Sequence, residues 1–380
     1  MPDTRPSSEP ATTGRRADRP DFEALRDARA HRPEAVSEAA AARHRRPQLA
    51  ARGQLMLVAA DHPARGALGV RSSAMAMADR YDLLERLVVA LGRPGVDGVL
   101  GTADILEDLL LLGALESKVV IASMNRGGLA GARFELDDRF TAYDADSVAG
   151  AGFDGGKMLC RIDLDDPGTV STLEACSRAV TGLAVRGLMA MVEPFLSRRV
   201  GGKVHNDLST EAVVRSVAIA AGLGATSAYT WLKLPVVEDM ASVMAATTLP
   251  TLLLGGDPDG SAEETYAEWE KALVLPGVRG LVVGRTLLYP QDGDVAGAVD
   301  TAARLVHPDA RPPGQGPAGR GTPTGTAPSG AAAPALRPDV GPDPGPPRAG
   351  QAAGTWPGAG AESPDVGSAS SDAGSAGVRP

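Results

Sequence analysis

Between residues 54 and 306, short apolar runs alternate with longer segments of helical periodicity. The apolar runs are rich in Val, Leu, Ile and Met and predict strands at residues 55–61, 98–102, 119–125, 157–163, 188–195, 229–235, 251–257 and 280–285. The segments between them predict helices, most clearly at residues 81–91, 167–186, 209–221 and 262–273. Strands that alternate with helices indicate βαβ units and a parallel sheet. Because eight such units close a barrel, the pattern predicts an α/β fold with a single (β/α)8 TIM barrel.

Composition changes on both sides of this region. Residues 307–380 hold 15 of the 30 prolines and consist largely of Pro, Gly, Ala and Ser. Such a segment cannot bury enough apolar surface to offset its ordering entropy, so we expect a disordered tail. Residues 1–48 are rich in Arg, Ala and Pro and contain one helix-like run, at 21–45, without a strong apolar face. The sequence therefore predicts a flexible arm at 1–48, a barrel at 49–306 and a disordered tail at 307–380.

The net charge and the cysteine content limit which binding partners and which cellular compartment we expect. The net charge of −9 argues against binding to nucleic acid or to acidic membranes, because there is no excess of cations to neutralise phosphates. No apolar run reaches 18 residues and no apolar signal core is present, so we expect a cytoplasmic protein. Cys160 and Cys176 lack metal-ligand spacing and are expected to be reduced. The sequence leaves open whether the chain forms a homo-oligomer.

The lysines are few and unevenly placed. Of the 38 basic residues 33 are Arg and only five are Lys. Two of the five, Lys157 and Lys233, fall inside predicted strands, where burying an ammonium is costly. This placement favours a chemical role for both.

Polar side chains collect near the predicted carboxyl ends of the strands, where barrel enzymes place their reacting groups. The first strand ends in Asp61, the fourth carries Lys157 and Arg161, the fifth carries Glu193 and the sixth carries Lys233. Alternation along a strand puts Lys157 and Arg161 on one face, together with Asp163. If these faces point inward, two lysines and two carboxylates share one cavity.

This set of residues suits imine chemistry. A lysine attacks a ketone only as the free amine, whose pKa falls through desolvation and a nearby cation. We assign Lys233 as the nucleophile and Lys157 as the second cation. Glu193 is the candidate acid and base for dehydrating the carbinolamine, and Asp61 for removing a substrate hydroxyl proton. The chemistry requires no metal and no cofactor.

Glycines at the last two strand ends suggest a place for a phosphate. Gly255 and Gly256 follow the seventh predicted strand, and Gly284 and Arg285 end the eighth. Exposed backbone N–H groups with an arginine form the phosphate site common in barrels, although glycine pairs more often mark turns. Arg161 is a further candidate for binding the substrate. Arg65 and Arg71 either bind a second anionic group or are surface residues.

These motifs, in this order, resemble the class I Schiff-base aldolases, including the deoxyribose-phosphate, fructose-bisphosphate and tagatose-bisphosphate aldolase groups. The resemblance covers residues 55–285 and rests on tripeptides such as Ala-Ala-Asp61, Val-Glu193-Pro and Leu-Lys233-Leu. It implies a metal-independent lyase acting on a phosphorylated sugar. Leu254 stands where the bisphosphate aldolases often have a serine, so the resemblance leaves the sugar open.

Other interpretations remain at this point. Lys233 could extend its ammonium to water from a strand end, Lys157 could pair structurally with Glu193 or Asp163, and Arg161 could pair with Asp163. The long connection at residues 126–156 is either a cover for the substrate or a surface excursion. The same barrel would also serve a transaldolase, a dehydratase or a catalytically inactive sensor of sugar phosphates.

Overall fold

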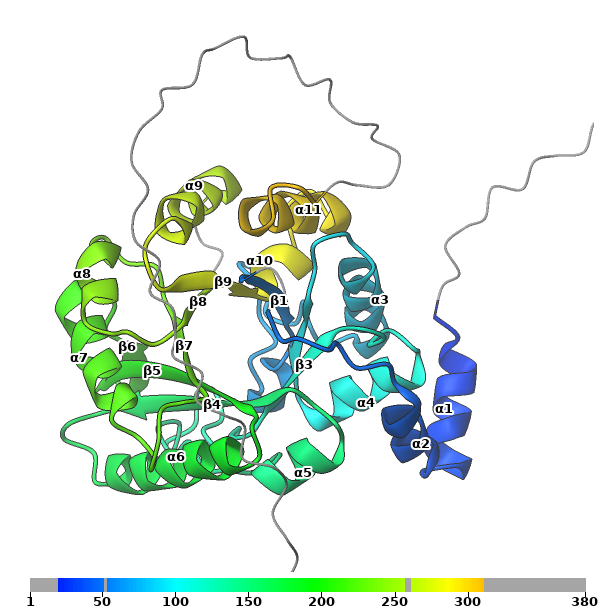
Figure 1. Cartoon of the computed structure of the whole chain (residues 1–380), viewed down its shortest axis with the longest axis horizontal. Helices are drawn as coiled ribbons and strands as arrows, with labels where there is room; N and C mark the ends of the chain where they lie inside the picture. The colour runs from blue at the N-terminus through cyan, green and yellow to red at the C-terminus, as the bar shows by residue number, and fades with distance from the viewer. Residues whose placement is uncertain (1–19, 51–52, 257–260, 311–380) are drawn as a thin grey trace, which may run out of the picture. The chain divides into compact units, whose positions relative to one another are not determined.

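The strands close on themselves into a parallel barrel. The structure, a computed structural model, describes residues 20–50, 53–256 and 261–310. Within these residues, eight parallel strands follow one another around the barrel, and a pairing between β4 and β5 closes it (Figure 1). They are β1 (Leu55–Ala59), β2 (Gly98–Gly101), β3 (Val119–Ser123), β4 (Gly155–Ile162), β5 (Met189–Val200), β7 (Thr230–Leu234), β8 (Thr251–Leu254) and β9 (Val278–Val283). The predicted (β/α)8 barrel is confirmed.

Helices connect the strands and surround the barrel (Figure 1). They are α3 (Arg80–Leu91), α4 (Ala103–Leu111), α5 (Ala145–Gly150), α6 (Gly168–Val185), α7 (Thr210–Ala221), α8 (Met240–Ala245), α9 (Ala262–Leu273), α10 (Arg285–Leu288) and α11 (Val295–Val306). The four helices predicted most clearly correspond to α3, α6, α7 and α9. No helix in the described ranges is both long and apolar enough to span a membrane.

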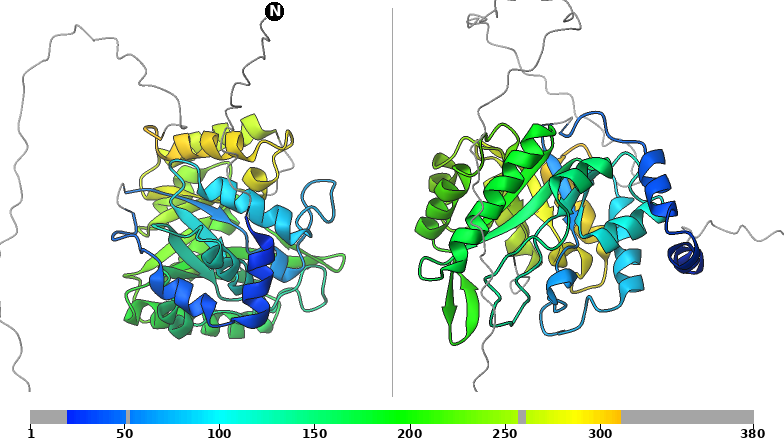
Figure 2. Two further views of the ribbon diagram at one scale, coloured as in Figure 1. Left: turned by 90° about the vertical axis from the view of Figure 1, so that its right-hand side faces the viewer. Right: turned by 90° about the horizontal axis from the view of Figure 1, so that it is seen from below.

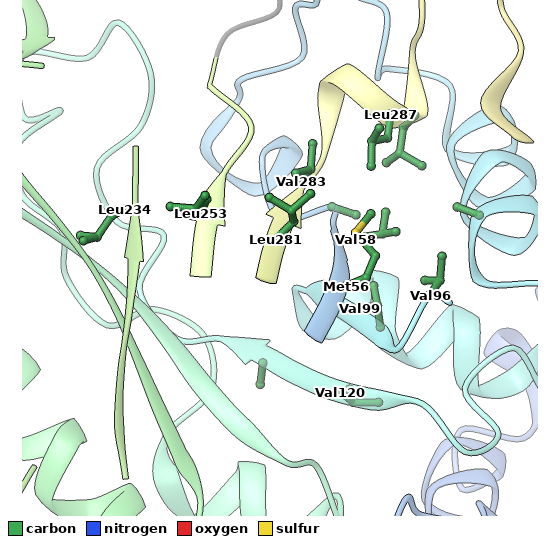
Figure 3. Packing of buried hydrophobic residues seen from close by; sticks show 14 of the residues in the cluster. Met56, Val58, Val96, Val99, Val120, Leu234, Leu253, Leu281, Val283 and Leu287 are labelled. Carbon is green, nitrogen blue, oxygen red and sulfur yellow. The ribbon is translucent and has the colours of Figure 1, made fainter. Parts of the chain in front are cut away.

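Two apolar layers result from the alternation of side chains along the strands. Residues such as Leu55, Leu57, Met191 and Leu252 point inward and fill the barrel. The residues between them point outward and pack against the helices, as Figure 3 shows for strand residues around Leu287 of α10. Apolar side chains therefore fill most of the interior. The polar side chains that face inward lie closer to the carboxyl ends of the strands.

The fifth strand is longer than predicted and turns back on itself. β5 continues to Val200 and pairs with the antiparallel β6 (Lys203–Asn206), which the sequence pattern missed. Gly201 and Gly202 form the turn with φ of 57° and 81°, a left-handed conformation that favours glycine. Figure 2 shows this hairpin as a green ribbon that extends beyond the neighbouring helices.

The segment before the barrel forms two helices in place of the single run expected at 21–45. These are α1 (Phe22–His31) and α2 (Ala35–Ala42). Arg29 of α1 pairs with Glu107 and Asp108 of α4, at 2.6 and 2.7 Å. The buried Arg43 donates to the carbonyl oxygens of Lys118 and Gly152. Residues 1–19 of the expected arm, 311–380 of the expected tail and Asp257 lie outside the described residues.

A buried carboxylate joins three parts of the chain at the amino-terminal end of the barrel. Asp97 accepts hydrogen bonds from Arg46 at 2.6 Å, from the backbone N–H of Met56 at 2.8 Å and from His307 Nε2 at 2.7 Å. Burial acts to raise the pKa of Asp97, but the bonds from His307, Met56 and Arg46 outweigh it and lower that pKa below its usual value. The carboxylate is therefore a stabilising anion in the folded state.

We predict that Asp97→Ala lowers the free energy of unfolding by about 3 kcal/mol or more, because it leaves buried partners unpaired. Since the folded pKa of Asp97 is depressed, its contribution is present above about pH 4 and is lost as the pH falls further. Urea unfolding of the wild-type protein and of Asp97→Ala between pH 3 and pH 7 measures this difference in free energy. Asp146→Ala, which removes a surface partner of Arg186, is the control and should cost less than about 1 kcal/mol. Equal effects of the two substitutions would contradict the assignment.

Candidate active site

A cavity of about 670 Å³ opens at the carboxyl ends of the strands. It is lined by the nine residues to which the sequence assigned a catalytic or binding role: Asp61, Lys157, Arg161, Glu193, Lys233, Gly255, Gly256, Gly284 and Arg285. The structure therefore brings these residues together, as their strand positions require. Their chemical roles remain predictions.

At the centre of the cavity, one carboxylate holds two lysines. Glu193 lies on β5, between the strands that carry Lys157 (β4) and Lys233 (β7). Its Oε1 contacts Nζ of Lys233 and its Oε2 contacts Nζ of Lys157. All three side chains are buried, with exposed fractions of 9% for Glu193, 7% for Lys233 and 2% for Lys157. Each lysine thus has its ammonium fixed against the same carboxyl group.

The charges of Glu193 and the two lysines shift the pKa values of Glu193 and Lys157. Burial acts to raise the pKa of Glu193, but attraction by Lys157 and Lys233 outweighs it and lowers the pKa to about 2. Burial and repulsion by Arg126 lower the pKa of Lys157 to about 8, although Asp61 and Glu193 act in the opposite direction. At neutral pH Lys157 is therefore still largely protonated.

Asp61, the expected base, accepts several hydrogen bonds from neighbouring side chains at one of its oxygens. Its Oδ2 accepts hydrogen bonds from Ser123 Oγ at 3.0 Å, from Lys157 Nζ at 3.2 Å and from the guanidinium of Arg126. Burial acts to raise the pKa of Asp61, but the attraction of Arg126 and Lys157 keeps it well below its usual value. This carboxylate remains an anion and is a weak proton acceptor at Oδ2.

Arg161 faces the cavity but already has a partner. Two of its nitrogens donate to the carboxylate of Asp138, at 2.6 and 2.9 Å, and one also donates to the carbonyl oxygen of Glu135. Among the described residues Arg161 does not pair with Asp163, the alternative that the sequence left open, and Asp163 accepts a hydrogen bond from the backbone N–H of Asp165. The alternative partner of Lys157, Asp163, is likewise replaced by Glu193 and Asp61.

The glycine-rich ends of β8 and β9 lie side by side on one wall of the cavity. Gly256 has a φ of 64°, in the left-handed region. A Cβ on Gly284 would meet the backbone of Ala59 and lie 3.0 Å from Cε1 of His62, so a larger residue does not fit there. Arg285 begins α10 directly after Gly284. The two strand ends and Arg285 therefore line the same part of the cavity.

Several residues of the cavity wall escaped the sequence pattern. The connection at 126–156 contributes Arg126 and Glu135 to the lining, and its aromatic residue Phe140 packs against the outer apolar layer. The β5–β6 hairpin contributes Val204, His205 and Asn206, and the loop after β1 contributes His62 and Arg65. Arg126 stands directly after a predicted strand end, which is the signal that could have identified it. Among the described residues, no three His, Cys, Asp or Glu side chains are grouped as metal ligands.

Arg65 belongs to a cluster of guanidinium groups on the wall formed by β4 and by the loops after β1 and β3. Burial and repulsion by Arg161 and Arg126 lower the pKa of Arg65 to about 10. Its Nε donates to the carbonyl oxygen of Gly128 at 3.0 Å, and Glu135 lies 3.5 Å away. Arg65 is therefore part of the cavity and not an isolated surface residue, whereas Arg71 donates to the carbonyl oxygen of Tyr289.

Comparison with known proteins identifies relatives of this barrel. A family model described as Cgl0159-like matches residues 53–303. The crystal structure of Cgl0159 from Corynebacterium glutamicum (Brevibacterium flavum) is 62% identical, covers 76% of this chain and 97% of that chain, and superposes with a TM-score of 0.74. The search of curated proteins found no match.

More distant structures include class I aldolases. An archaeal fructose-1,6-bisphosphate aldolase, with its catalytic lysine covalently bound to the carbinolamine intermediate of the substrate, is 21% identical. It covers 71% of this chain and 99% of that chain, with a TM-score of 0.52. The fructose-bisphosphate aldolase from Slackia heliotrinireducens is 15% identical over 77% of this chain and 91% of that chain, with a TM-score of 0.51. At these identities the likeness establishes a shared fold.

We predict that Glu193→Gln lowers the pKa of Lys157 below its value of about 8. The substitution removes an attraction that raises this pKa and leaves the repulsion from Lys233 and Arg126 in place. With only five lysines in the chain, NMR of protein labelled with ¹⁵N-lysine can follow each ammonium with pH. Lys271, exposed on α9, is the internal control and should not change. A higher pKa of Lys157 in the variant would show that Glu193 does not govern it.

Proposed function

The chain belongs to the Cgl0159-like family, and from the geometry of its barrel site we propose that it is a class I aldolase, which cleaves or forms a carbon–carbon bond in a phosphorylated sugar through an imine on Lys233. The observation that carries this proposal is the contact of one carboxylate, Glu193, with two buried lysines. Two ammonium groups and one carboxyl group at the mouth of a barrel match the needs of imine formation: a nucleophile, a cation and a proton carrier.

Lys233 is better placed than Lys157 to be the nucleophile. Lys157 contacts two carboxylates, Asp61 and Glu193, whereas Glu193 is the acidic partner of Lys233. Lys233 is also somewhat more exposed to the cavity. In addition, β7 lies next to β8, so Lys233 is close to the glycine wall where we place the phosphate. Lys157 then stays protonated and serves as the second cation of the site.

Glu193 can carry the protons that imine formation moves. Attack of the Lys233 amine on a ketone gives a carbinolamine, and loss of water from it needs a proton donor at the departing oxygen. Once Lys233 is no longer an ammonium, Glu193 loses part of the attraction that lowers its pKa and can hold a proton transiently. The resulting iminium accepts the electron pair of the broken carbon–carbon bond. The archaeal aldolase with the same fold, whose lysine carries a carbinolamine, supports this assignment by analogy.

We predict that sodium borohydride, added with dihydroxyacetone phosphate or fructose 1,6-bisphosphate, fixes the ligand to the chain through a reduced imine. Peptide mass mapping should place the adduct on Lys233. Lys233→Ala should abolish it, whereas Lys271→Ala, a substitution on the surface of α9, should leave it unchanged.

Two results would contradict this assignment. An adduct on Lys157 in the wild-type protein would reverse the roles of the two lysines. Absence of an adduct with these probes and with deoxyribose 5-phosphate, combined with unchanged ligand binding by Lys233→Ala, would favour a sugar-phosphate sensor over an enzyme.

The phosphate assignment predicts a difference between two related probes. Dihydroxyacetone phosphate should form the adduct at lower concentration than dihydroxyacetone, because Gly255, Gly284 and Arg285 offer donors to its phosphate. Arg285→Gln should reduce this difference by about tenfold or more, the effect of losing a charge-assisted hydrogen bond. Measuring adduct yield against concentration for both probes tests this. An unchanged preference in the variant would place the phosphate elsewhere in the cavity.

A further inference from the structure

The two oxygens of Asp61 have different surroundings. Ser123, Arg126 and Lys157 all donate to Oδ2. Within the described chain no group hydrogen-bonds to Oδ1, and Nδ1 of His62 lies 4.0 Å from it. Oδ2 of Asp61 therefore accepts three hydrogen bonds, whereas Oδ1 faces the imidazole of His62.

His62 is held between this carboxylate and the glycine wall. It follows Asp61 directly and precedes the 3-10 turn η1 (Pro63–Arg65). Its Cε1 lies close to Gly284, where a Cβ would approach to 3.0 Å. Nδ1 is buried and has no hydrogen-bond partner among the described residues, while the side chain is 26% exposed and lines the cavity. The ring thus spans the space between the reaction centre and the expected phosphate.

The neighbours of the ring determine which nitrogen carries the proton. Burial, opposed by Asp61, lowers the pKa of His62 to about 3, so the imidazole is neutral at working pH. A neutral imidazole has one N–H donor and one bare acceptor. Because Asp61 Oδ1 is an acceptor, the N–H belongs on Nδ1, and a closure of about 1 Å would give a hydrogen bond of ordinary length. Nε2 is then a bare acceptor on a side chain that faces the cavity.

We propose that His62 is the catalytic residue that accepts the substrate hydroxyl proton during carbon–carbon cleavage, and that Asp61 is the residue that positions it. This inference rests on the proposed aldolase function and replaces the direct role expected for Asp61. In the step, the O–H bond of the hydroxyl breaks and its proton moves to Nε2 of His62. The freed electron pair forms the carbonyl of the departing aldehyde. The electrons of the carbon–carbon bond pass to the nitrogen on Lys233 and give an enamine. Closure of Oδ1 onto the Nδ1–H strengthens the attraction by which Asp61 raises the pKa of His62, which makes Nε2 a stronger proton acceptor and stabilises the imidazolium.

The test separates imine formation from cleavage in the full-length protein. Borohydride trapping with dihydroxyacetone phosphate needs the imine but no hydroxyl base, so His62→Gln should give an adduct within about twofold of wild type. Cleavage of fructose 1,6-bisphosphate, or of whichever ketose phosphate the wild type turns over, should fall by about 10²- to 10⁴-fold, the range for loss of a general base. His44→Gln, with a side chain that is 89% exposed, is the matched control and should retain both activities.

The outcomes distinguish this inference from the function on which it rests. A normal adduct together with cleavage within about twofold of wild type in His62→Gln would overturn the role of His62 alone and return the proton transfer to Asp61. Loss of the adduct in a folded His62→Gln protein would show that the ring acts on Lys233 and would also overturn the proposal. Absence of any adduct in the wild-type protein would overturn the aldolase function itself.

Discussion

The site depends on the contact between Glu193 and the two lysines, because without it two ammonium groups would face each other in a buried space. Lys157 and Lys233 lie on the strands to either side of β5, and their repulsion acts at short range. Desolvating three charges costs several kcal/mol for each, and buried ion pairs often fail to repay this cost. Their presence at the open end of the barrel is therefore weak evidence for stability and stronger evidence for chemistry.

The apolar interior of the barrel separates Glu193 and the two lysines from the amino-terminal end. Apolar side chains such as Leu57, Met191 and Leu252 fill the interior toward the amino-terminal end, so the charged groups lie at its open end. Asp97 joins the segment before the barrel to the residue after α11 at the opposite end, away from the lysines. Stabilising contacts and the groups that we propose to be reactive thus lie at different ends of the barrel, which is the general arrangement in such barrels.

Much of the site followed from the sequence because strand positions are regular. A period of two along each strand is enough to place Lys157, Glu193 and Lys233 on inward faces once the barrel is assumed. The β5–β6 hairpin was missed because its strands carry Arg198, Arg199 and Lys203 without an apolar alternation, leaving only the Gly201-Gly202 turn as a signal.

Contacts across the cavity were not predictable in the same way. The pairing of Arg126 with Asp61 and of Asp138 with Arg161 depends on the path of a long connection, which no local pattern specifies. The asymmetry between the two oxygens of Asp61, and with it the role proposed for His62, appears only when side chains from β1, β3 and β4 are placed together.

A crystal structure of the protein soaked with dihydroxyacetone phosphate would show whether Lys233 forms the imine. We expect continuous electron density between Nζ of Lys233 and the carbonyl carbon of the ligand, with Glu193 in contact with that nitrogen and Lys157 unmodified. A ligand bound without a covalent link, with Lys233 still paired to Glu193, or a ligand attached to Lys157, would contradict it.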